Sequence, residues 1–167
     1  MNSYMTYWDS PVGCLEITAT DTCLTTLSKV QTSVRKVVYP DGEPEKLNPL
    51  LKETIRQLKE YFDGKLRAFS IPTRQEGTPF QQKVWEALTT IPYGERISYS
   101  ELAGMIGHPQ SFRAVGNANG ANHICIIVPC HRVIQLNGQL GGYAYGLEMK
   151  RFLLDLEKNV EAIQSPA

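Results

Sequence analysis

The first thirty residues alternate apolar and polar side chains, which is the pattern of half-buried β-strands. The stretches YMTYW at residues 4–8 and CLEITAT at residues 14–20 alternate in this way, and the turn-forming sequence SPVG at residues 10–13 separates them. Residues 23–30 predict a third strand. The pattern therefore predicts a small antiparallel meander.

A helical repeat replaces this alternation after an expected loop at residues 41–44. Apolar side chains recur at spacings of three and four residues, and Gly64 supplies a stop signal. The apolar positions are Leu47, Leu50, Leu51, Ile55, Leu58, Tyr61 and Phe62. We expect one amphipathic helix here. No motif that carries chemistry occurs before residue 76, which indicates a scaffold.

Two helix starts are predicted from N-cap chemistry. The sequence TPFQ at residues 78–81 has threonine at the N-cap, proline at the first helical position and glutamine at the third, as in a capping box. Ser98 and Glu101 repeat this spacing and predict a short helix that stops at Gly107. The first of these helices should end at Ile91-Pro92 and bury Phe80, Val84, Trp85 and Leu88.

A third helix is predicted from Pro109 through Arg113 to about Asn119, with Gly120 just after its end. Two short helices joined by a tight turn outline a helix-turn-helix. The third helix has few bulky side chains, so a backbone or a nucleobase could approach it closely. A tight helix–helix contact inside a core has the same pattern, which leaves the function open.

The segment ICIIV at residues 124–128 has the composition of a buried strand, and Pro129 cannot continue a central strand. Cys130 is therefore expected where the chain bends toward a surface or a cleft. His131 and Arg132 would favour the reactive thiolate if their side chains lie close to the sulfur. Sequence neighbours often point apart, so a packed, unreactive cysteine is the alternative.

The overall charge gives no general case for binding nucleic acid, because Lys plus Arg and Asp plus Glu both number 17. Residues 102–147 nevertheless contain no carboxylate and hold two arginines and all three histidines. This segment could receive a phosphate backbone. The same charge pattern is equally compatible with a polar, glycine-rich segment that lacks acidic residues and does not bind DNA.

The four cysteines form no CxxC pair, and their spacing from the histidines predicts no metal site. No apolar run approaches the roughly 18 residues of a membrane helix, and the N-terminus shows no secretory signal. We therefore expect free thiols in a reducing, cytoplasmic compartment and no membrane partner. We also expect a monomer.

The segment around Cys130 resembles a known active site. The run IVPCHRVI at residues 127–134 is similar to the acceptor signature of the O6-alkylguanine-DNA alkyltransferases. Motifs in matching order cover essentially all of residues 77–160, and the preceding residues fit the family's N-terminal domain less specifically. The further matches are GTPFQQKVW at 77–85, ISY at 97–99, FRAVG at 112–116, NGAN at 119–122, GY at 142–143 and residues 150–157.

The resemblance implies an α/β (α+β) fold of two small domains. Residues 1–76 would form a ribonuclease-H-like scaffold with a three-stranded antiparallel sheet. Residues 77–167 would form a mostly helical, winged helix-turn-helix domain that binds DNA and accepts the alkyl group.

The resemblance also implies direct DNA repair. A methyl or other alkyl group would pass from O6-alkylguanine, and from O4-alkylthymine, to the protein's own cysteine after minor-groove binding and base flipping. A thioether is a poor leaving group, so each molecule would react once. The implied partner is double-stranded DNA containing O6-alkylguanine, and neither a cofactor nor a metal is implied.

Each matching residue takes a role from the resemblance. Cys130 would accept the alkyl group, and His131, oriented by Glu157, would act as a base through a bridging water. Tyr99 would donate a hydrogen bond to the departing guanine, and Arg113 would fill the base stack after the target has left. The DNA-binding residues would be Tyr99, Ser100, Arg113, Ala114 and Gly116.

The substrate pocket is expected around the acceptor. Asn122 would brace the active-site turn, and the backbone carbonyls of Cys130 and Val133 would accept from the guanine amino group. The amide of Ala144 would face O6. The other pocket residues would be Cys125, Tyr143 and Tyr145.

Several positions depart from the family pattern. His123 stands where proline is common, Cys125 where proline or serine is common, and Tyr145 where glycine is common. Ser111-Phe112 replace two small residues beside the expected finger. These departures bear on pocket size and substrate range and leave the acceptor chemistry intact.

Two other functions are compatible with parts of this pattern. A cysteine hydrolase using Cys130, His131 and an acid would turn over repeatedly. A DNA-damage sensor would bind without reacting, but the related alkyltransferase-like sensors carry tryptophan where this chain has Cys130. The cysteine therefore favours transfer over sensing.

Overall fold

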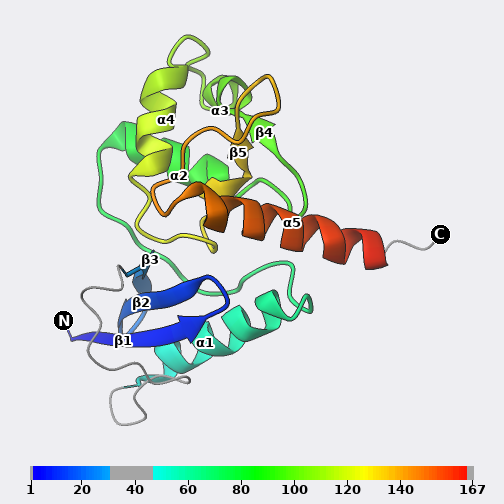
Figure 1. The fold of residues 1–167 in the computed structure, drawn as a ribbon. Helices are drawn as coiled ribbons and strands as arrows, with labels where there is room; N and C mark the ends of the chain where they lie inside the picture. Colours follow the sequence, from blue (N-terminus) through cyan, green and yellow to red (C-terminus); the bar gives the residue numbers. More distant parts are fainter. Residues whose placement is uncertain (1, 31–46, 165–167) are drawn as a thin grey trace. The chain divides into compact units, whose positions relative to one another are not determined.

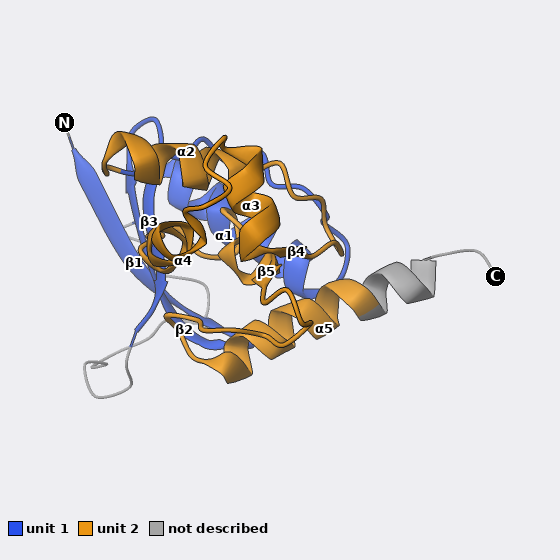
Figure 2. Ribbon diagram, turned by 90° about the horizontal axis from the view of Figure 1, so that it is seen from above, with its two compact units in different colours: residues 1–75 blue, residues 76–167 orange. Residues whose placement is uncertain are grey.

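The protein is described from a computed structural model, over residues 2–30 and 47–164, with side chains described up to residue 158. The loop expected at residues 41–44 lies outside these ranges. The chain divides into two compact units, Met1–Gln75 and Glu76–Ala167 (Figure 2). Each unit is considered by itself below.

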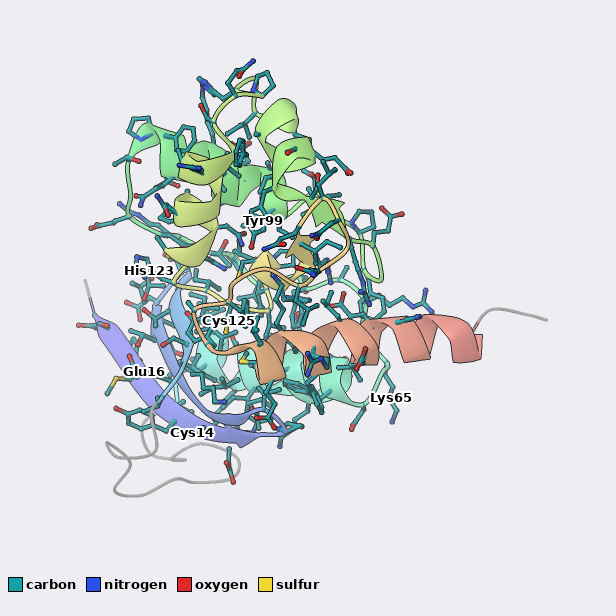
Figure 3. All side chains as sticks on the ribbon, turned by 45° about the horizontal axis from the view of Figure 1, so that its top comes forward. Cys14, Glu16, Lys65, Tyr99, His123 and Cys125 are labelled. Carbon is teal, nitrogen blue, oxygen red and sulfur yellow. The ribbon has the colours of Figure 1, made fainter. Side chains whose placement is uncertain are left out.

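The first unit begins with a three-stranded antiparallel sheet in the order β1-β2-β3 (Figure 1). The three predicted strands are confirmed as β1 (Ser3–Ser10), β2 (Gly13–Thr20) and β3 (Leu24–Lys29). Ser10 Oγ donates to the Gly13 carbonyl oxygen at 2.6 Å and closes the first hairpin. The sheet is the predicted meander, and its side chains include the buried Cys14 (Figure 3).

The helix α1 (Pro49–Phe62) packs against this sheet. Of the predicted apolar stripe it buries Leu51, Ile55, Leu58 and Tyr61, whereas Leu50 and Phe62 are half-buried. Its N-cap is Asn48, whose Oδ1 accepts from the Leu51 amide at 2.8 Å. The helix therefore begins after Leu47, which sequence periodicity had included. In this unit the structure shows apolar packing and helix capping, in keeping with a scaffold.

The second unit opens with α2 (Pro79–Leu88), whose capping box between Thr78 and Gln81 is confirmed. Val84, Trp85 and Leu88 are buried as predicted, whereas Phe80 is only half-buried. Trp85 Nε1 donates to the Ala118 carbonyl oxygen at 2.9 Å, which connects α2 to α4 (Phe112–Gly120). The indole N–H is satisfied inside the core, so the contact fixes where α4 lies.

The helix-turn-helix consists of α3 (Tyr99–Met105), capped by Ser98, and α4. The prediction that the second helix begins at Pro109 is wrong, because Pro109 lies in a turn closed by the Ser111 amide donating to the His108 carbonyl at 2.9 Å. Proline suits such a turn as well as it suits a helix start. Gly120 lies inside α4, and the C-cap is Ala121.

The predicted strand at residues 124–128 is also wrong. All but the half-buried Ile127 are buried, but they form a turn in which the Val128 amide donates to the Ile124 carbonyl at 3.1 Å. Ile126 adopts a left-handed conformation with φ of 69°. An apolar run of five residues indicates burial and does not by itself distinguish a strand from a compact turn.

A parallel pair of two-residue strands, β4 (Ile97–Ser98) and β5 (Val133–Ile134), was not predicted. It places the start of α3 beside the chain that follows Cys130. The last element, α5 (Leu147–Gln164), directs Met149, Lys150, Leu153, Leu154 and Glu157 into the second unit. Within the described ranges, no helix is long and apolar enough to cross a membrane.

Candidate functional site

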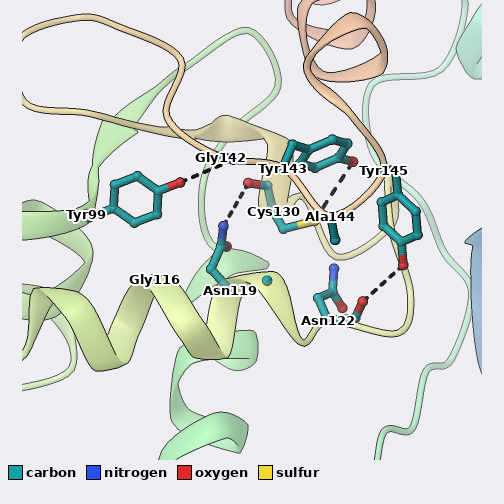
Figure 4. A pocket seen from close by; sticks show the side chains of 10 residues that line it. Tyr99, Gly116, Asn119, Asn122, Cys130, Gly142, Tyr143, Ala144 and Tyr145 are labelled. Carbon is teal, nitrogen blue, oxygen red and sulfur yellow. Dashed lines mark hydrogen bonds between the residues drawn. The ribbon is translucent and has the colours of Figure 1, made fainter.

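A cavity of about 290 Å³ in the second unit has Cys130 in its wall (Figure 4). The start of α3, the C-terminal half of α4 and the loop before α5 supply the rest of the wall. The lining residues are Tyr99, Gly116, Asn119, Gly120, Asn122, Cys130, Gly142, Tyr143, Ala144 and Tyr145. A ligand inside this cavity would lie against a thiol.

Cys130 begins a 3₁₀ turn, Cys130–Arg132, that follows the buried turn at residues 124–128. Asn122 holds that buried turn: its Nδ2 donates to the Ile124 and Val128 carbonyls at 3.2 and 2.8 Å, and its Oδ1 accepts from the Ile124 amide at 3.1 Å. The three bonds satisfy backbone groups that a strand would have paired. The Cys130 thiol therefore follows a turn that three side-chain hydrogen bonds hold in place.

The Cys130 thiol is almost completely buried, and its Sγ donates to the Tyr143 hydroxyl oxygen at 4.0 Å. Burial raises the pKa of Cys130. Asn122, Tyr143 and the charge of Lys150 act in the opposite direction without overcoming burial. At neutral pH the resting group is a thiol, so a base must take its proton before the sulfur can attack.

His131 lies beside this thiol in sequence, but its ring is directed to Glu157. His131 Nε2 is 2.6 Å from Glu157 Oε2, and both side chains are buried. A carboxylate only accepts, so Nε2 carries the proton and Nδ1 of the neutral ring is left as an acceptor. Nδ1 is buried and has no hydrogen-bond partner among the described residues. The ring therefore offers one basic nitrogen.

Arg132 does not face the thiol. Its Nε and Nη2 donate to the two oxygens of Glu157 at 2.8 and 3.1 Å, and its Nη1 donates to the Ile91 carbonyl at 2.6 Å. Burial opposes ionisation of Glu157, but His131 and Arg132 together hold the pKa of the carboxyl well below its usual range. Burial disfavours the charged ring and lowers the pKa of His131, and the positive charges of Arg132 and Lys150 act in the same direction against the effect of Glu157. His131 is thus neutral beside an ionised Glu157.

Tyr99 separates the cavity from a second one of about 490 Å³. Its hydroxyl donates to the Gly142 carbonyl at 3.5 Å, and burial raises its pKa, so the phenol keeps its proton. Gly141 has φ of 72°, and a Cβ there would come within 3.1 Å of the Tyr99 ring. The second cavity is lined by Tyr99, Ser100, Phe112, Gly116, Gln135, Leu136, Gly141 and Gly142.

Two tyrosines of the loop before α5 close the other side of the cavity. The rings of Tyr143 and Tyr145 meet edge to face with centroids 5.5 Å apart. The Tyr145 hydroxyl donates to the Asn122 carbonyl at 3.2 Å, as Figure 4 shows. The Tyr145 ring is therefore held at the cavity wall by a bond to the segment that follows α4.

Comparison with known proteins finds a match for each of the two units. The family model for the DNA-binding domain of 6-O-methylguanine DNA methyltransferase matches residues 79–159, and the model for its ribonuclease-like domain matches residues 3–75. The chain belongs to the 6-O-methylguanine DNA methyltransferase family. The sequence resemblance to this family is confirmed, and so is the fold class it implied.

Relatives match along most of their length. The methylated-DNA–protein-cysteine methyltransferase of Methanosarcina acetivorans is 45% identical over 92% of this chain and 97% of its own. The constitutive methylated-DNA–protein-cysteine methyltransferase of Bacillus subtilis is 45% identical over 93% of this chain and 96% of its own. A crystal structure of Mycobacterium tuberculosis OGT in complex with DNA is 45% identical, covers 92% of each chain and has a TM-score of 0.81.

The family resemblance gave no role to Lys150, which the structure buries behind the cavity wall, close enough for its charge to act on Cys130. Its side chain is buried, and Nζ donates to the carbonyls of Val133, Leu140 and Gly142 at 2.7, 2.5 and 3.1 Å. Burial lowers its pKa to about 8. The cation near Cys130 is therefore Lys150 and not Arg132. Its place at the start of the family match at residues 150–157 was the available sequence signal.

The remaining predicted residues do not all meet at the cavity. Arg113, Ala114 and Ser100 are exposed, and neither arginine of the carboxylate-free segment lines either cavity. Cys125 is fully buried and is absent from both linings (Figure 3). Val133 is also buried, and its carbonyl already accepts from Lys150.

The charge of the carboxylate-free segment is smaller than its sequence indicated. Glu157, from α5, neutralises Arg132, so Arg113 is the exposed arginine of the segment. Within residues 2–30 and 47–158, no group of three or more His, Cys, Asp or Glu side chains is arranged to hold a metal ion.

Proposed function

We propose that this protein repairs O6-alkylguanine in duplex DNA by moving the alkyl group onto Sγ of Cys130. The observation that carries the proposal is a buried thiol in a cavity wall, followed in sequence by a neutral histidine with one unpartnered basic nitrogen. The relatives named methylated-DNA–protein-cysteine methyltransferases support the same chemistry. A bond forms between sulfur and the alkyl carbon while the bond from that carbon to O6 breaks.

Two proton movements accompany the transfer. The thiol proton passes through a water to His131 Nδ1. This nitrogen is the available base, because Nε2 is bound to Glu157 and Nδ1 has no partner among the described residues. The departing guanine becomes negatively charged, and the protonated Tyr99 hydroxyl in the cavity wall donates to it. Ala144 lines the same cavity, which supports a role for its amide in donating to O6.

Base flipping is required, because a stacked, paired guanine cannot enter a cavity in the protein. Arg113 is exposed in the first turn of α4 and is suited to fill the stack that the target has left. Ser100, Ala114 and Gly116 are small residues near the starts of α3 and α4, which permits close approach to a minor groove. The protein therefore recognises the damaged base by the ease with which it flips out of the DNA duplex, and not by the surrounding sequence.

Transfer is irreversible, because a thioether sulfur is a poor leaving group. A cysteine hydrolase would form a thioester that water cleaves, whereas a thioether on Cys130 is not cleaved by water, so a hydrolase would turn over and this protein would not. O4-alkylthymine is a further substrate of the same site. All four cysteines are free thiols, and we place the protein in the reducing cytoplasm.

Intact-mass measurement tests the proposed function. The protein is mixed with increasing amounts of a duplex that contains one O6-methylguanine, and peptide mapping then locates the modification. We expect one methyl group per protein molecule, on Cys130, and unmodified guanine in the DNA. Repair of more than one equivalent of duplex would contradict the single-turnover proposal.

Arg113→Ala is expected to slow methyl transfer from duplex DNA by about ten- to a hundredfold, because the flipped state loses the side chain that holds it and flipping costs a few kcal/mol. Transfer from the same lesion in a short single strand should change by less than about threefold, since no stack must be filled. Single-turnover rates measure both.

The matched control is Arg151→Ala, which removes an exposed arginine on α5. Equal slowing of Arg113→Ala on both substrates would exclude the proposed role of Arg113 in filling the base stack.

Tyr145 is expected to restrict bulky adducts. Its ring lines the cavity and is held there by the bond to the Asn122 carbonyl, so a benzyl group must displace it. We expect Tyr145→Gly to react with free O6-benzylguanine at least tenfold faster than the unmodified protein, which corresponds to relief of about 1–3 kcal/mol of overpacking.

Tyr145→Phe keeps the ring and removes only the hydrogen bond, so its benzyl rate should lie between the other two. Methyl transfer from duplex DNA serves as the control for a loop loosened by the added glycine. Equal benzyl rates in the unmodified protein and in Tyr145→Gly would show that Tyr145 does not limit pocket size.

A further inference from the structure

The second cavity, of about 490 Å³, adjoins the cavity that holds the Cys130 thiol. Tyr99, Gly116 and Gly142 belong to the walls of both cavities (Figure 4). Both cavities lie in the second unit, which contains the helix-turn-helix. The sugar of a nucleotide is bonded directly to its base, so a base that enters the first cavity brings its sugar to this shared wall.

Two exposed apolar side chains from different elements line the second cavity. Phe112 is the first residue of α4 and is 48% exposed. Leu136 follows β5 and is 78% exposed, in a turn where the Gly138 amide donates to the Gln135 carbonyl at 3.0 Å. Apolar side chains that gather at an exposed hollow are typical of a binding surface.

The face of α4 that carries Phe112 continues along both cavities. Phe112, Gly116 and Gly120 are four residues apart and therefore lie along one face of the helix. The first of them lines the second cavity, the next lines both cavities, and the last lines the cavity of the thiol. Arg113 lies about 100° further around the helix and lines neither cavity. Phe112 therefore faces the flipped nucleotide, while Arg113 remains free to fill the base stack.

The lining of the second cavity favours an uncharged and largely apolar occupant. Among the described residues, none of the side chains that line it is charged, so it does not neutralise a phosphate. The deoxyribose is the uncharged part of the flipped nucleotide that lies next to the base. Its C2′ atom carries only hydrogen, so this edge of the sugar can contact apolar side chains without losing hydrogen bonds.

We propose that Phe112 and Leu136 contact the 2′ edge of the deoxyribose of the flipped nucleotide and thereby select DNA over RNA. The inference rests on the proposed function. A ribose would bring its 2′-hydroxyl against these two apolar side chains, and a hydroxyl that loses water without gaining a partner is costly. This hydroxyl is the group by which a protein distinguishes RNA from DNA at one nucleotide. Phe112 and Leu136 are therefore specificity-determining residues.

The test uses three DNA duplexes that differ only at the 2′ position of the lesion nucleotide, which carries hydrogen, a hydroxyl or fluorine beside the same O6-methylguanine base. Single-turnover methyl transfer to Cys130 is measured for each by intact mass. We expect the unmodified protein to react with the deoxy duplex about ten- to a hundredfold faster than with the ribo duplex. The 2′-fluoro sugar has the ring pucker of ribose and no hydroxyl, so its rate should stay within about threefold of the deoxy rate.

The ratio of the deoxy rate to the ribo rate is then compared between variants, because it cancels changes in folding and in thiol reactivity. Leu136→Ser supplies a polar partner for the 2′-hydroxyl, and Phe112→Ala opens the cavity wall to water. Each should lower the ratio to less than about threefold, whereas Phe112→Leu keeps an apolar wall and should retain it. Leu147→Ser and Met105→Ala are the matched controls, since both remove an exposed apolar side chain that lines neither cavity.

A ratio near one in the unmodified protein would overturn the inference, because Ser100 or Gln135 in the lining would then satisfy the 2′-hydroxyl. Transfer from the 2′-fluoro duplex as slow as from the ribo duplex would also contradict it, since ring pucker would then be the property that is sensed. An unchanged ratio in both Leu136→Ser and Phe112→Ala would do the same. Failure of the unmodified protein to take methyl from the deoxy duplex would instead overturn the proposed function. The failures are distinguishable, because the first three require active protein.

Discussion

Replacing Cys130 with alanine is expected to abolish methyl transfer while the affinity for duplex DNA stays within about threefold of the original. The sulfur is the acceptor, and no other cysteine lines either cavity. Affinity comes from contacts made by α3 and α4 to the DNA backbone, which the substitution does not touch. Intact mass after incubation with an O6-methylguanine duplex measures transfer, and fluorescence anisotropy measures binding.

Cys125→Ala is the matched control for this experiment. Cys125 is also buried and lies five residues before the acceptor, but it does not reach the cavity wall. We expect the control variant to take up one methyl group as the unmodified protein does. Methyl uptake by Cys130→Ala at Cys125 would mean that the cavity rearranges to bring the second thiol to the lesion.

Glu157→Gln is expected to lower the free energy of unfolding by several kcal/mol. The carboxylate accepts from His131, from Arg132 twice and from the Gly94 amide, and it is almost fully buried. A neutral amide leaves the Arg132 cation buried without a counter-charge, which costs roughly 3–5 kcal/mol. The sequence analysis gave Glu157 only the role of orienting His131, because it did not place Arg132 on this carboxylate.

The same variant should slow transfer, because a glutamine holds the His131 ring less firmly and stabilises its cationic form less. Thermal unfolding measures the first effect, and single-turnover rates below the melting transition measure the second. Asp155→Asn, an exposed acid on the same helix, is the control and should change neither by much. A melting temperature equal to that of Asp155→Asn would contradict the buried network.

The pH dependence of stability has a defined sign. The folded-state pKa of Glu157 is depressed, so its contribution is present above the unfolded value of 4.5 and is lost as pH falls through the folded value. The folded-state pKa of His131 is also lowered, so acid favours the unfolded protein once pH falls below the unfolded value of 6.5. Both groups therefore lower the stability of the folded protein as pH falls. Glu157→Gln should lack the contribution of the Glu157 carboxyl to this loss.

Local chemistry explains which elements could be predicted. The capping box at Thr78 and Gln81 and the strand alternation around the first hairpin depend on residues close in sequence, and both predictions are confirmed. The predictions for residues 124–128 and for Pro109 were wrong, because an apolar run and a proline each fit two local structures. The choice between them depends on distant partners such as Asn122.

The sequence by itself determined the kind of chemistry that this protein carries. The cysteine, histidine and arginine at residues 130–132 and the ordered motifs around them were sufficient to identify the family, which is confirmed. Motif residues are adjacent in the chain, so covalent connectivity keeps them together whatever the rest of the fold does. Their identity and order could therefore be recognised without a structure.

Only the tertiary structure decided what each of these residues faces. Arg132 turns to Glu157, 25 residues away, and to Ile91, 41 residues away, so Lys150 and not Arg132 is the cation near the thiol. Asn119 likewise turns its amide nitrogen to the carbonyl of Cys130, 11 residues away. Hydrogen bonds and ion pairs depend on distances of about 3 Å and on direction, and for residues far apart in sequence packing alone sets both.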